Sequence, residues 1–258
     1  MLHAEVSGSG PRLVVAHGFT QTGRCWGPFG DLVFAGREVV AVDLPGHAGS
    51  NDVRANLVEA GGLLVEAGGT QPFDLLGYSL GARVALHAAL RKPVNLRRLV
   101  LIGGTAGIED PAARAARRAR DSALADELEL SGDVDGFLRR WLAAPMFAGL
   151  RDTAVEERGR NTAAGLASSL RLAGAGTQEP LWDRLGEIDA PLLSVAGADD
   201  VRFAVAAQRM AGGVASGVVS LVPGAGHAAH LEQPRLSARI IERFFAPGLP
   251  NDPEGAHG

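Results

Sequence analysis

The chain has 258 residues, of which 46% are hydrophobic and 21% are charged, enough apolar material for one globular domain with an insertion. A net charge of −4 gives no reason to expect a general affinity for nucleic acid, and the single cysteine excludes an intramolecular disulfide and any cysteine-rich metal site. No stretch approaches the roughly 18 consecutive apolar residues that span a bilayer, and no secretory signal is visible, so we expect a cytoplasmic protein without membrane insertion.

Short apolar runs alternate with helical patterns along the chain, which predicts an α/β fold with a mostly parallel central sheet flanked by helices. Several runs are continuous Val and Leu without alternation, as expected for strands buried on both faces. Strands are expected, in chain order, at 2–6 (an edge strand), 12–16, 38–42, 73–76, 99–102, 192–195 and 218–222. Helices are expected between them at 52–67, 80–91, 202–212 and 234–245.

The alternation breaks between residues 104 and 186, where the sequence is rich in Ala, Arg, Glu and Leu and contains no convincing strand. An all-helical insertion in such a sheet is most naturally a cap over the carboxyl edge of the strands, where open α/β sheets bind ligands. We therefore expect an α/β core of residues 1–104 and 186–247 with a helical cap at 105–185. The turn-forming residues 248–258 are expected to be disordered.

A candidate nucleophile, Ser79, lies in the pentapeptide Gly77-Tyr78-Ser79-Leu80-Gly81, which matches the pattern G-x-S-x-G. The pattern is short and arises by chance in a glycine-rich chain, so its surroundings carry the argument. It follows an apolar run and opens a helical pattern, and this strand–turn–helix setting is what a nucleophile elbow requires. The two glycines let the strand and helix approach without side-chain clashes. We expect Ser79 to be catalytic rather than part of a turn without chemistry.

A serine nucleophile needs a base, and the base needs an acid that orients it. His227 follows the last expected strand, at the end of the glycine-rich loop Pro223–His227, which can fold back over the sheet edge. Two aspartates, Asp199 and Asp200, follow the preceding strand. The spacing Gly-x-x-Asp favours Asp200, although Asp199 stays open. The catalytic residues then come in the chain order serine, aspartate, histidine, as in α/β-hydrolases.

Other groups near the strand ends are expected to support this site. The backbone amides of Phe19 and Leu80 would form an oxyanion hole for charge developing on a substrate oxygen. The imidazole of His17 is expected to hold the loop that carries Phe19, and the turn Asp43–His47 is expected to be structural. No zinc-enzyme pattern surrounds His230, so we expect a structural role for it and neither a catalytic metal nor an organic cofactor.

Together these motifs resemble those of the α/β-hydrolase superfamily over nearly the whole chain. More narrowly, the sequence is similar to the 2-succinyl-6-hydroxy-2,4-cyclohexadiene-1-carboxylate synthases of menaquinone biosynthesis. The stretches Ala16–Thr20 and Gly224–His230 are shared across the superfamily and are weakly specific. The narrower matches are Arg83, four residues after the serine, and the stretches Trp141–Phe147 and Gly174–Trp182.

The resemblance implies a lyase that eliminates pyruvate from 2-succinyl-5-enolpyruvyl-6-hydroxy-3-cyclohexene-1-carboxylate. In such an enzyme Ser79, polarised by His227 and Asp200, acts as a base, and no acyl-enzyme is required. The substrate carries three carboxylates, so its pocket needs several fixed cations. Substrate contacts are expected from Arg83, Arg117, Arg158, Tyr78, Trp141 and Phe147. By position, further candidates are Arg114, Arg118 and Arg202.

Two other functions remain open. A serine hydrolase, either a carboxylesterase or a carbon–carbon-bond hydrolase, uses the same triad and oxyanion hole, and one fold commonly supports several chemistries. A non-catalytic ligand receptor can also keep the triad. Converging arginines favour a small-molecule polycarboxylate as the partner, and hence the lyase, whereas an esterase for neutral substrates needs an apolar pocket. The sequence leaves the oligomeric state open.

Overall fold

A computed structural model describes residues 1–150 and 154–246, and it contains one seven-stranded sheet in the order β1-β3-β2-β4-β5-β6-β7. The first strand pairs antiparallel with β3, and every other neighbouring pair is parallel. The strands are β1 (Ala4–Gly8), β2 (Arg12–Ala16), β3 (Glu38–Val42), β4 (Phe73–Tyr78), β5 (Leu96–Ile102), β6 (Leu192–Gly197) and β7 (Gly217–Val222).

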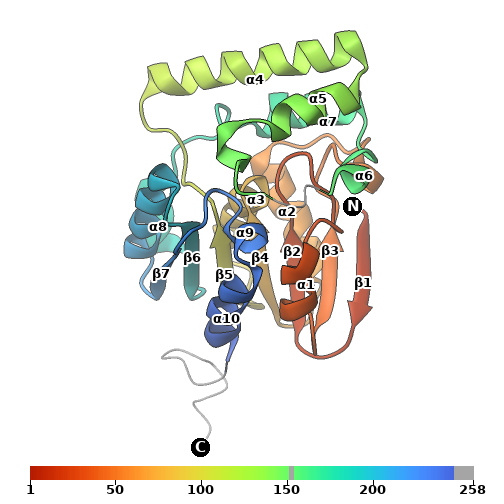
Figure 1. The fold of residues 1–258 in the computed structure, drawn as a ribbon. Helices are drawn as coiled ribbons and strands as arrows, with labels where there is room; N and C mark the ends of the chain where they lie inside the picture. Colours follow the sequence, from red (N-terminus) through yellow and green to blue (C-terminus); the bar gives the residue numbers. More distant parts are fainter. Residues whose placement is uncertain (151–153, 247–258) are drawn as a thin grey trace, which may run out of the picture.

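Helices cover both faces of this sheet (Figure 1). Successive side chains of a strand point to opposite faces, so Leu13 and Val15 join one buried cluster while Val14 and Ala16 join another. The cluster around Val14 receives α2, α3 and α8, and the cluster around Leu13 receives α1 and α10. The flanking helices are α1 (Gly27–Val33), α2 (Leu57–Gly68), α3 (Leu80–Ala89), α8 (Val201–Gly213), α9 (Ala229–Glu232) and α10 (Pro234–Phe245).

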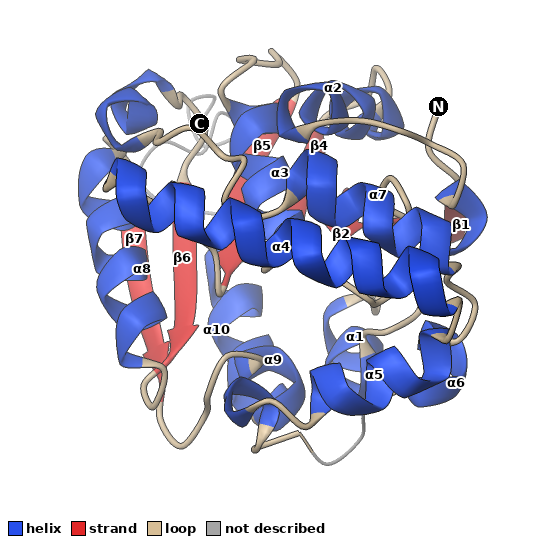
Figure 2. Cartoon of the chain, turned by 90° about the horizontal axis from the view of Figure 1, so that it is seen from above, coloured by secondary structure: helices blue, strands red, loops and turns tan. Residues whose placement is uncertain are grey.

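Between β5 and β6 the described chain forms helices and loops only, and these lie over one end of the sheet (Figures 1 and 2). We call helices α4 to α7 the cap. Its elements are α4 (Pro111–Ser131), α5 (Val134–Leu142), the 3-10 turn η2 (Pro145–Phe147), α6 (Val155–Arg158) and α7 (Ala163–Ala173), and a further 3-10 turn, η3 (Trp182–Glu187), leads back to the sheet.

The longest cap helix, α4, has clear signals at both ends. Asp110 accepts a hydrogen bond from the Ala113 amide and Pro111 occupies the first turn, while Gly132 closes the helix in the left-handed conformation. Its inner face packs on α5 and α7 in a separate apolar cluster, so the cap has a small core of its own. The buried members of that cluster are Ala125, Leu128, Phe137, Leu166, Ala167 and Leu170.

The predicted α/β class is confirmed, and each expected strand is present within a few residues of its predicted bounds. The helix expected from residue 52 begins only at Leu57, because Asn56 caps it in a reciprocal box with Glu59. Helices α1 and α9 were not expected; α1 is seven residues long and α9 four, too short for a clear period. The expected disorder of 248–258 lies outside the described residues.

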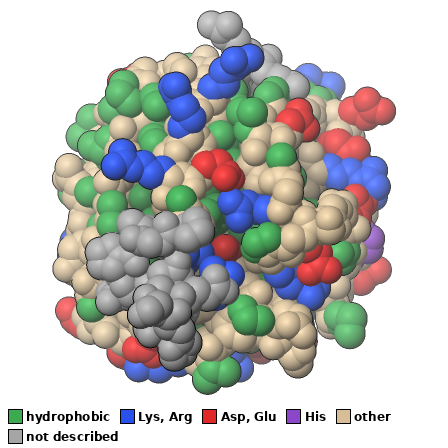
Figure 3. Space-filling view, turned by 90° about the horizontal axis from the view of Figure 1, so that it is seen from below, with side chains coloured by type: hydrophobic (Ala, Val, Ile, Leu, Met, Phe, Trp, Pro, Cys, Tyr) green, Lys and Arg blue, Asp and Glu red, His purple; other side chains and the backbone are tan. Residues whose placement is uncertain are grey.

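The face opposite the cap carries basic and acidic side chains interspersed with apolar ones (Figure 3). Among the described residues, no helix is long and apolar enough to cross a membrane. The division into core and cap domains at residues 104 and 186 remains our proposal, and it follows the order of the elements.

Replacing Leu128 with alanine is expected to lower the free energy of unfolding by about 2–5 kcal/mol, because Leu128 is fully buried in the cap cluster. The matched control is Leu130→Ala on the same helix, where the side chain is 92% exposed and the expected change is within about 0.5 kcal/mol. Urea unfolding of the three proteins measures both values. Equal losses in the two variants would contradict the cap core.

Candidate active site

The backbone at Ser79 turns sharply between strand β4 and helix α3. Its φ of 52° lies in the left-handed region, which is costly for a residue with a side chain and is retained only where the surroundings enforce it. The Ser79 amide donates to the Ile102 carbonyl at the end of β5, at 2.9 Å, and the Arg83 amide donates back to the Ser79 carbonyl at 3.1 Å. The turn therefore presents the hydroxyl above the sheet edge and at the start of a helix.

Close backbone approach explains the glycines of this turn. A side-chain carbon on Gly81 would lie 2.0 Å from the Ala16 carbonyl oxygen, and one on Gly77 would lie 2.4 Å from the Gly81 carbonyl oxygen. Neither contact is possible without moving the backbone, because the obstacles are main-chain atoms. The G-x-S-x-G spacing is thus required by the packing of α3 on β2 and β4.

Three side chains from three strand ends form a hydrogen-bonded chain. The Ser79 Oγ lies 3.1 Å from His227 Nε2, and His227 Nδ1 lies 3.0 Å from Asp200 Oδ2. Asp199, the competing aspartate, is exposed, and its amide donates to the Ala225 carbonyl instead. Hydroxyl, imidazole and carboxylate in this order let the imidazole accept the serine proton while the carboxylate holds the ring.

Asp200 is stabilised in its charged form despite partial burial. Burial raises the pKa of this carboxyl, but the hydrogen bond and charge of His227, the Phe203 amide and the charge of Arg202 together lower it below its ordinary value. The carboxylate also caps α8 by accepting from the Phe203 amide at 3.4 Å. The acid that orients His227 is therefore an anion at neutral pH.

The sequence suggests the backbone amides of Phe19 and Leu80 as donors to a substrate oxygen. Both residues line the same cavity as Ser79, and within the described residues neither amide donates to another protein group. Leu80 is the first residue of α3, where the helix N-terminus favours negative charge. These two donors remain our candidates for an oxyanion hole.

Two neutral histidines hold the loop that carries Phe19. His17 donates from Nδ1 to the Gly18 carbonyl and accepts the Leu44 amide at Nε2, 3.0 Å away. His47 accepts the Thr20 amide at Nε2 at 3.2 Å. Burial lowers the pKa of His17 to about 4 and that of His47 to about 3, so each ring stays uncharged and keeps an acceptor nitrogen.

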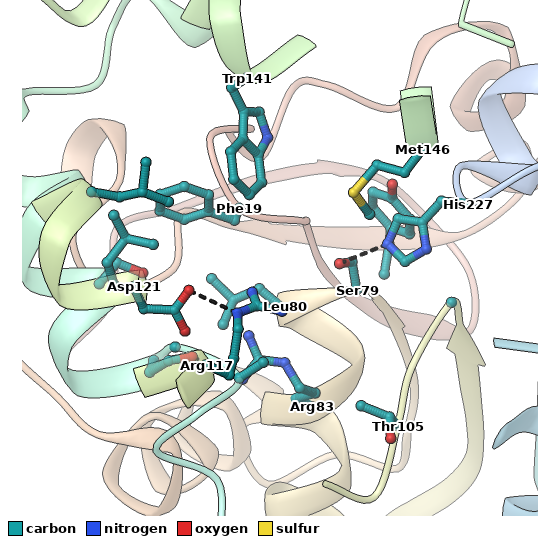
Figure 4. A pocket seen from close by; sticks show the side chains of 18 of the residues that line it. Phe19, Ser79, Leu80, Arg83, Thr105, Arg117, Asp121, Trp141, Met146 and His227 are labelled. Carbon is teal, nitrogen blue, oxygen red and sulfur yellow. Dashed lines mark hydrogen bonds and ion pairs between the residues drawn. The ribbon is translucent and has the colours of Figure 1, made fainter. Parts of the chain in front are cut away.

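A cavity of about 400 Å³ opens between the cap and the sheet edge, with Ser79 and His227 on its wall. Figure 4 shows Trp141 descending into it from the cap, with Arg83 and Arg117 at the end away from His227 and Met146. Five arginines and one aspartate line it. They are Arg83, Arg117, Arg120, Arg158, Arg202 and Asp121.

The arginine Arg83 is buried without a carboxylate partner of its own. It donates to the Ala173 carbonyl of α7 at 2.8 Å, and burial followed by the charge of Arg117 lowers its pKa to about 10. Arg117 is paired with Asp121 at 2.8 Å, four residues along α4. At neutral pH the end of the cavity near Arg83 therefore carries more positive than negative charge, an arrangement suited to a bound anion.

The third predicted arginine, Arg158, is buried at the end of α6 and donates to the Thr20 hydroxyl. Asn161, one turn further on, donates to the Thr20 carbonyl at 2.8 Å and accepts the Ala48 amide. Thr20 has a φ of 68°, so these contacts hold a strained residue next to Phe19. The cap thus supports the loop of the candidate oxyanion hole directly.

Aromatic side chains close the cavity on the cap side. The Trp141 ring meets Phe19 edge-on at 5.2 Å and Phe147 at 6.0 Å, and Phe147 reaches His227 at 6.3 Å. Tyr78 is buried beneath, 5.6 Å from the His227 ring, and burial raises the pKa of its hydroxyl. All four aromatic residues line the cavity, so its walls are apolar between the arginines.

A family model described as the alpha/beta hydrolase family matches residues 13–240. The chain belongs to this family. It is 33% identical over 244 residues to 2-succinyl-6-hydroxy-2,4-cyclohexadiene-1-carboxylate synthase of Klebsiella pneumoniae, covering 92% of this chain and 94% of that protein. It is 32% identical over 219 residues to the enzyme of the same name from Serratia proteamaculans, covering 80% and 82%. The solved structure of MenH from S. aureus matches with a TM-score of 0.84 at 28% identity, over 95% of this chain and 98% of that one.

These comparisons confirm the resemblance predicted from the motifs. Two of the arginines suggested by position, Arg114 and Arg118, do not line the cavity. Arg114 pairs with Glu179 at 3.3 Å and donates to the Ile108 carbonyl, and Arg118 donates to the Gly176 carbonyl. Both therefore hold the cap to the segment before β6.

His230 lies in an aromatic cage below the site, with Tyr78 at 4.4 Å, Phe29 at 5.3 Å and Trp26 at 5.6 Å. Burial lowers its pKa to about 3. No group of three or more potential metal ligands occurs among residues 1–150 and 154–246.

Several cavity residues escaped the sequence analysis. Asp121 was overlooked, although its spacing of four from Arg117 on a helix is a usable signal. Gln21 accepts the Gly18 amide at 2.9 Å, and Ser169 and Met146 also line the cavity. No pattern in the sequence singles these three out, because each reaches the cavity only through tertiary packing.

The pH dependence of stability is expected to reflect buried neutral histidines. Burial lowers the pKa of His17 and His87 to about 4 and of His47 and His230 to about 3. Below about pH 6.5 these histidines bind protons in the unfolded chain but not in the folded chain. Their contribution to the free energy of unfolding is therefore complete above that pH and decreases toward pH 4. Each histidine contributes a slope of up to about 1.4 kcal/mol per pH unit.

Urea unfolding between pH 7 and 4.5 measures this slope. In His230→Phe the slope should decrease by about the share of one histidine, because the variant removes one of the groups that take up a proton on unfolding. An unchanged slope in that variant would show that His230 is not a neutral, buried group.

Proposed function

We propose that this protein is a carbon–oxygen lyase that eliminates pyruvate from 2-succinyl-5-enolpyruvyl-6-hydroxy-3-cyclohexene-1-carboxylate, giving 2-succinyl-6-hydroxy-2,4-cyclohexadiene-1-carboxylate. The observation that carries the proposal is a serine–histidine–aspartate chain opening into a cavity lined by five arginines and one aspartate, an excess of four positive charges. Relatives that match over most of the chain bear the name of the synthase that forms this product.

The charge of the cavity fits the substrate. The proposed substrate carries three carboxylates, and each needs a charge-assisted partner once it leaves water. A neutral ester would leave buried Arg83 without a counter-ion, which is costly. A cavity of about 400 Å³ with apolar walls between the arginines suits a single ring with charged arms.

The geometry supports proton abstraction followed by elimination. The hydrogen on the ring carbon that bears the succinyl ketone is acidic, because the carbonyl can take up the resulting negative charge. Ser79 removes this proton while it gives its own to Nε2 of His227, 3.1 Å away. The Phe19 and Leu80 amides stabilise the enolate oxygen. The ring double bond then shifts as the carbon–oxygen bond to enolpyruvate breaks, and the proton held by His227 returns through Ser79 to the departing group.

A serine hydrolase remains the second candidate, favoured by one observation. The same hydroxyl, imidazole and amides would equally serve attack on an ester carbonyl, with Ser79 as nucleophile. The arginine-rich cavity argues against neutral esters but not against a charged one. The distinction is whether Ser79 becomes covalently bonded during turnover.

Ser79→Ala is expected to lower the rate of pyruvate release by about ten-thousand-fold or more, because the base is removed and only binding and charge stabilisation remain. Release is followed with purified protein and the enolpyruvyl precursor, beside a reaction without enzyme, since the precursor also eliminates slowly by itself. A native chain that releases pyruvate no faster than that background would exclude the lyase. A Ser79→Ala protein as active as the native one would exclude the base.

Arg83→Met is expected to lower kcat/KM for the same substrate by about 100-fold, because a buried charge contact is lost while the apolar stem is kept. Arg139→Met is the matched control, since Arg139 is exposed on the cap helix α5 and does not line the cavity. Its kcat/KM should stay within about twofold of the native value. Equal effects in the two variants would show that the loss is general rather than due to the cavity.

A further inference from the structure

Two of the cavity arginines, Arg120 and Arg202, lie on its outer rim, and of these only Arg202 was suggested by its position in the sequence. Arg120 and Arg202 are both exposed and both line the cavity. Within residues 1–150 and 154–246 neither makes an ion pair with a carboxylate, whereas Arg117 beside them is paired with Asp121. Two other exposed arginines of the cap are neutralised, Arg140 by Glu127 and Arg160 by Glu157.

The two rim arginines come from different parts of the fold. Arg120 lies one turn after Arg117 on cap helix α4, so it belongs to the end of the cavity that contains Arg83. Arg202 is the second residue of α8, and its guanidinium stands 5.6 Å from the ring of Phe203. Phe203 in turn packs against His227 at 4.4 Å. Arg202 therefore belongs to the opposite, His227 end.

An unpaired arginine on each side of an opening creates a positive potential where a ligand enters. Partly exposed charges act over about 10 Å at ordinary ionic strength, and low-dielectric walls extend that reach. Arg202 already exerts such an influence, since its charge helps to lower the pKa of Asp200. Among the described residues, the acidic side chain that lines the cavity is Asp121, and it is already paired with Arg117.

We propose that Arg120 and Arg202 form an outer anion-binding site that captures the carboxylate arms of the substrate before they reach Arg83. This inference rests on the proposed polycarboxylate substrate and identifies two residues that would determine which anions the cavity captures. The pair selects ligands whose carboxylates are far enough apart to contact both Arg120 and Arg202. Because the two guanidinia act on capture, their loss lowers kcat/KM more than kcat.

The test compares Arg120→Gln, Arg202→Gln and the double variant with the native chain in pyruvate release at about 10 mM and about 500 mM salt. At low salt kcat/KM is expected to fall about fivefold in each single variant and about 20-fold in the double, with kcat within about twofold. At high salt the differences should shrink below about twofold, because screening removes the steering. Arg139→Gln, exposed on the cap but away from the cavity, is the control and should match the native chain at both salt concentrations.

Salt-independent losses, equal losses in Arg139→Gln, or losses in kcat alone would overturn the outer site.

A second measurement tests the outer site independently of the lyase reaction. A small neutral fluorophosphonate labels Ser79, and propane-1,2,3-tricarboxylate is added as a protecting anion. The native chain should be protected at concentrations about fivefold or more below those needed by the double variant, with unprotected labelling rates equal.

If the native chain is protected at lower concentrations than the double variant but releases no pyruvate, the proposed reaction fails while the outer site stands. If protection is the same in the native chain and the double variant, the outer site fails whatever the reaction.

Discussion

The backbone constraint at Ser79 determines the arrangement of the rest of the site. Strand β4 and helix α3 meet so closely that Gly81 lies against the Ala16 carbonyl, and the residue between them must adopt a φ of 52°. That conformation directs the hydroxyl toward His227 and places the Leu80 amide at a helix N-terminus. It also fixes Arg83 one turn along the same helix. One strained turn therefore positions the proposed base, one candidate oxyanion donor and the buried cation together.

The cap covers the site and adds charged side chains that the turn at Ser79 does not provide. Arg117 and Arg158 come from cap helices, and the Ala173 carbonyl of the cap holds Arg83 in place. Arg158 also bonds to Thr20, so the element that brings positive charge to the cavity supports the loop beside Phe19. The same helix therefore brings a cavity arginine and supports the loop of the candidate oxyanion hole. A hydrolase fold with an apolar cap would lack these charges, and such differences in the site let one fold serve different chemistries.

Much of the fold and of the candidate site was predictable because the signals are local. The strands are continuous apolar runs, Ser79 occurs in a motif whose glycines are required by backbone contacts, and His227 ends a glycine-rich loop. The choice of Asp200 over Asp199 followed from spacing alone, and only Asp200 contacts the histidine. The rest depends on contacts distant in sequence: nothing local separates cavity-facing Arg120 from Arg118, which holds the cap. The roles of the site residues and the cytoplasmic location stay predictions.

The central claim is that Ser79 acts as a base toward carbon rather than as a nucleophile. The most direct measurement is kcat/KM of the native chain for a substrate deuterated at the ring carbon that bears the succinyl ketone, compared with the unlabelled compound. Proton abstraction predicts a rate lowered by about twofold or more, because the carbon–hydrogen bond breaks in the step that Ser79 catalyses. Equal rates for the two compounds, with a substrate fragment found covalently bonded to Ser79, would contradict the account and identify a hydrolase.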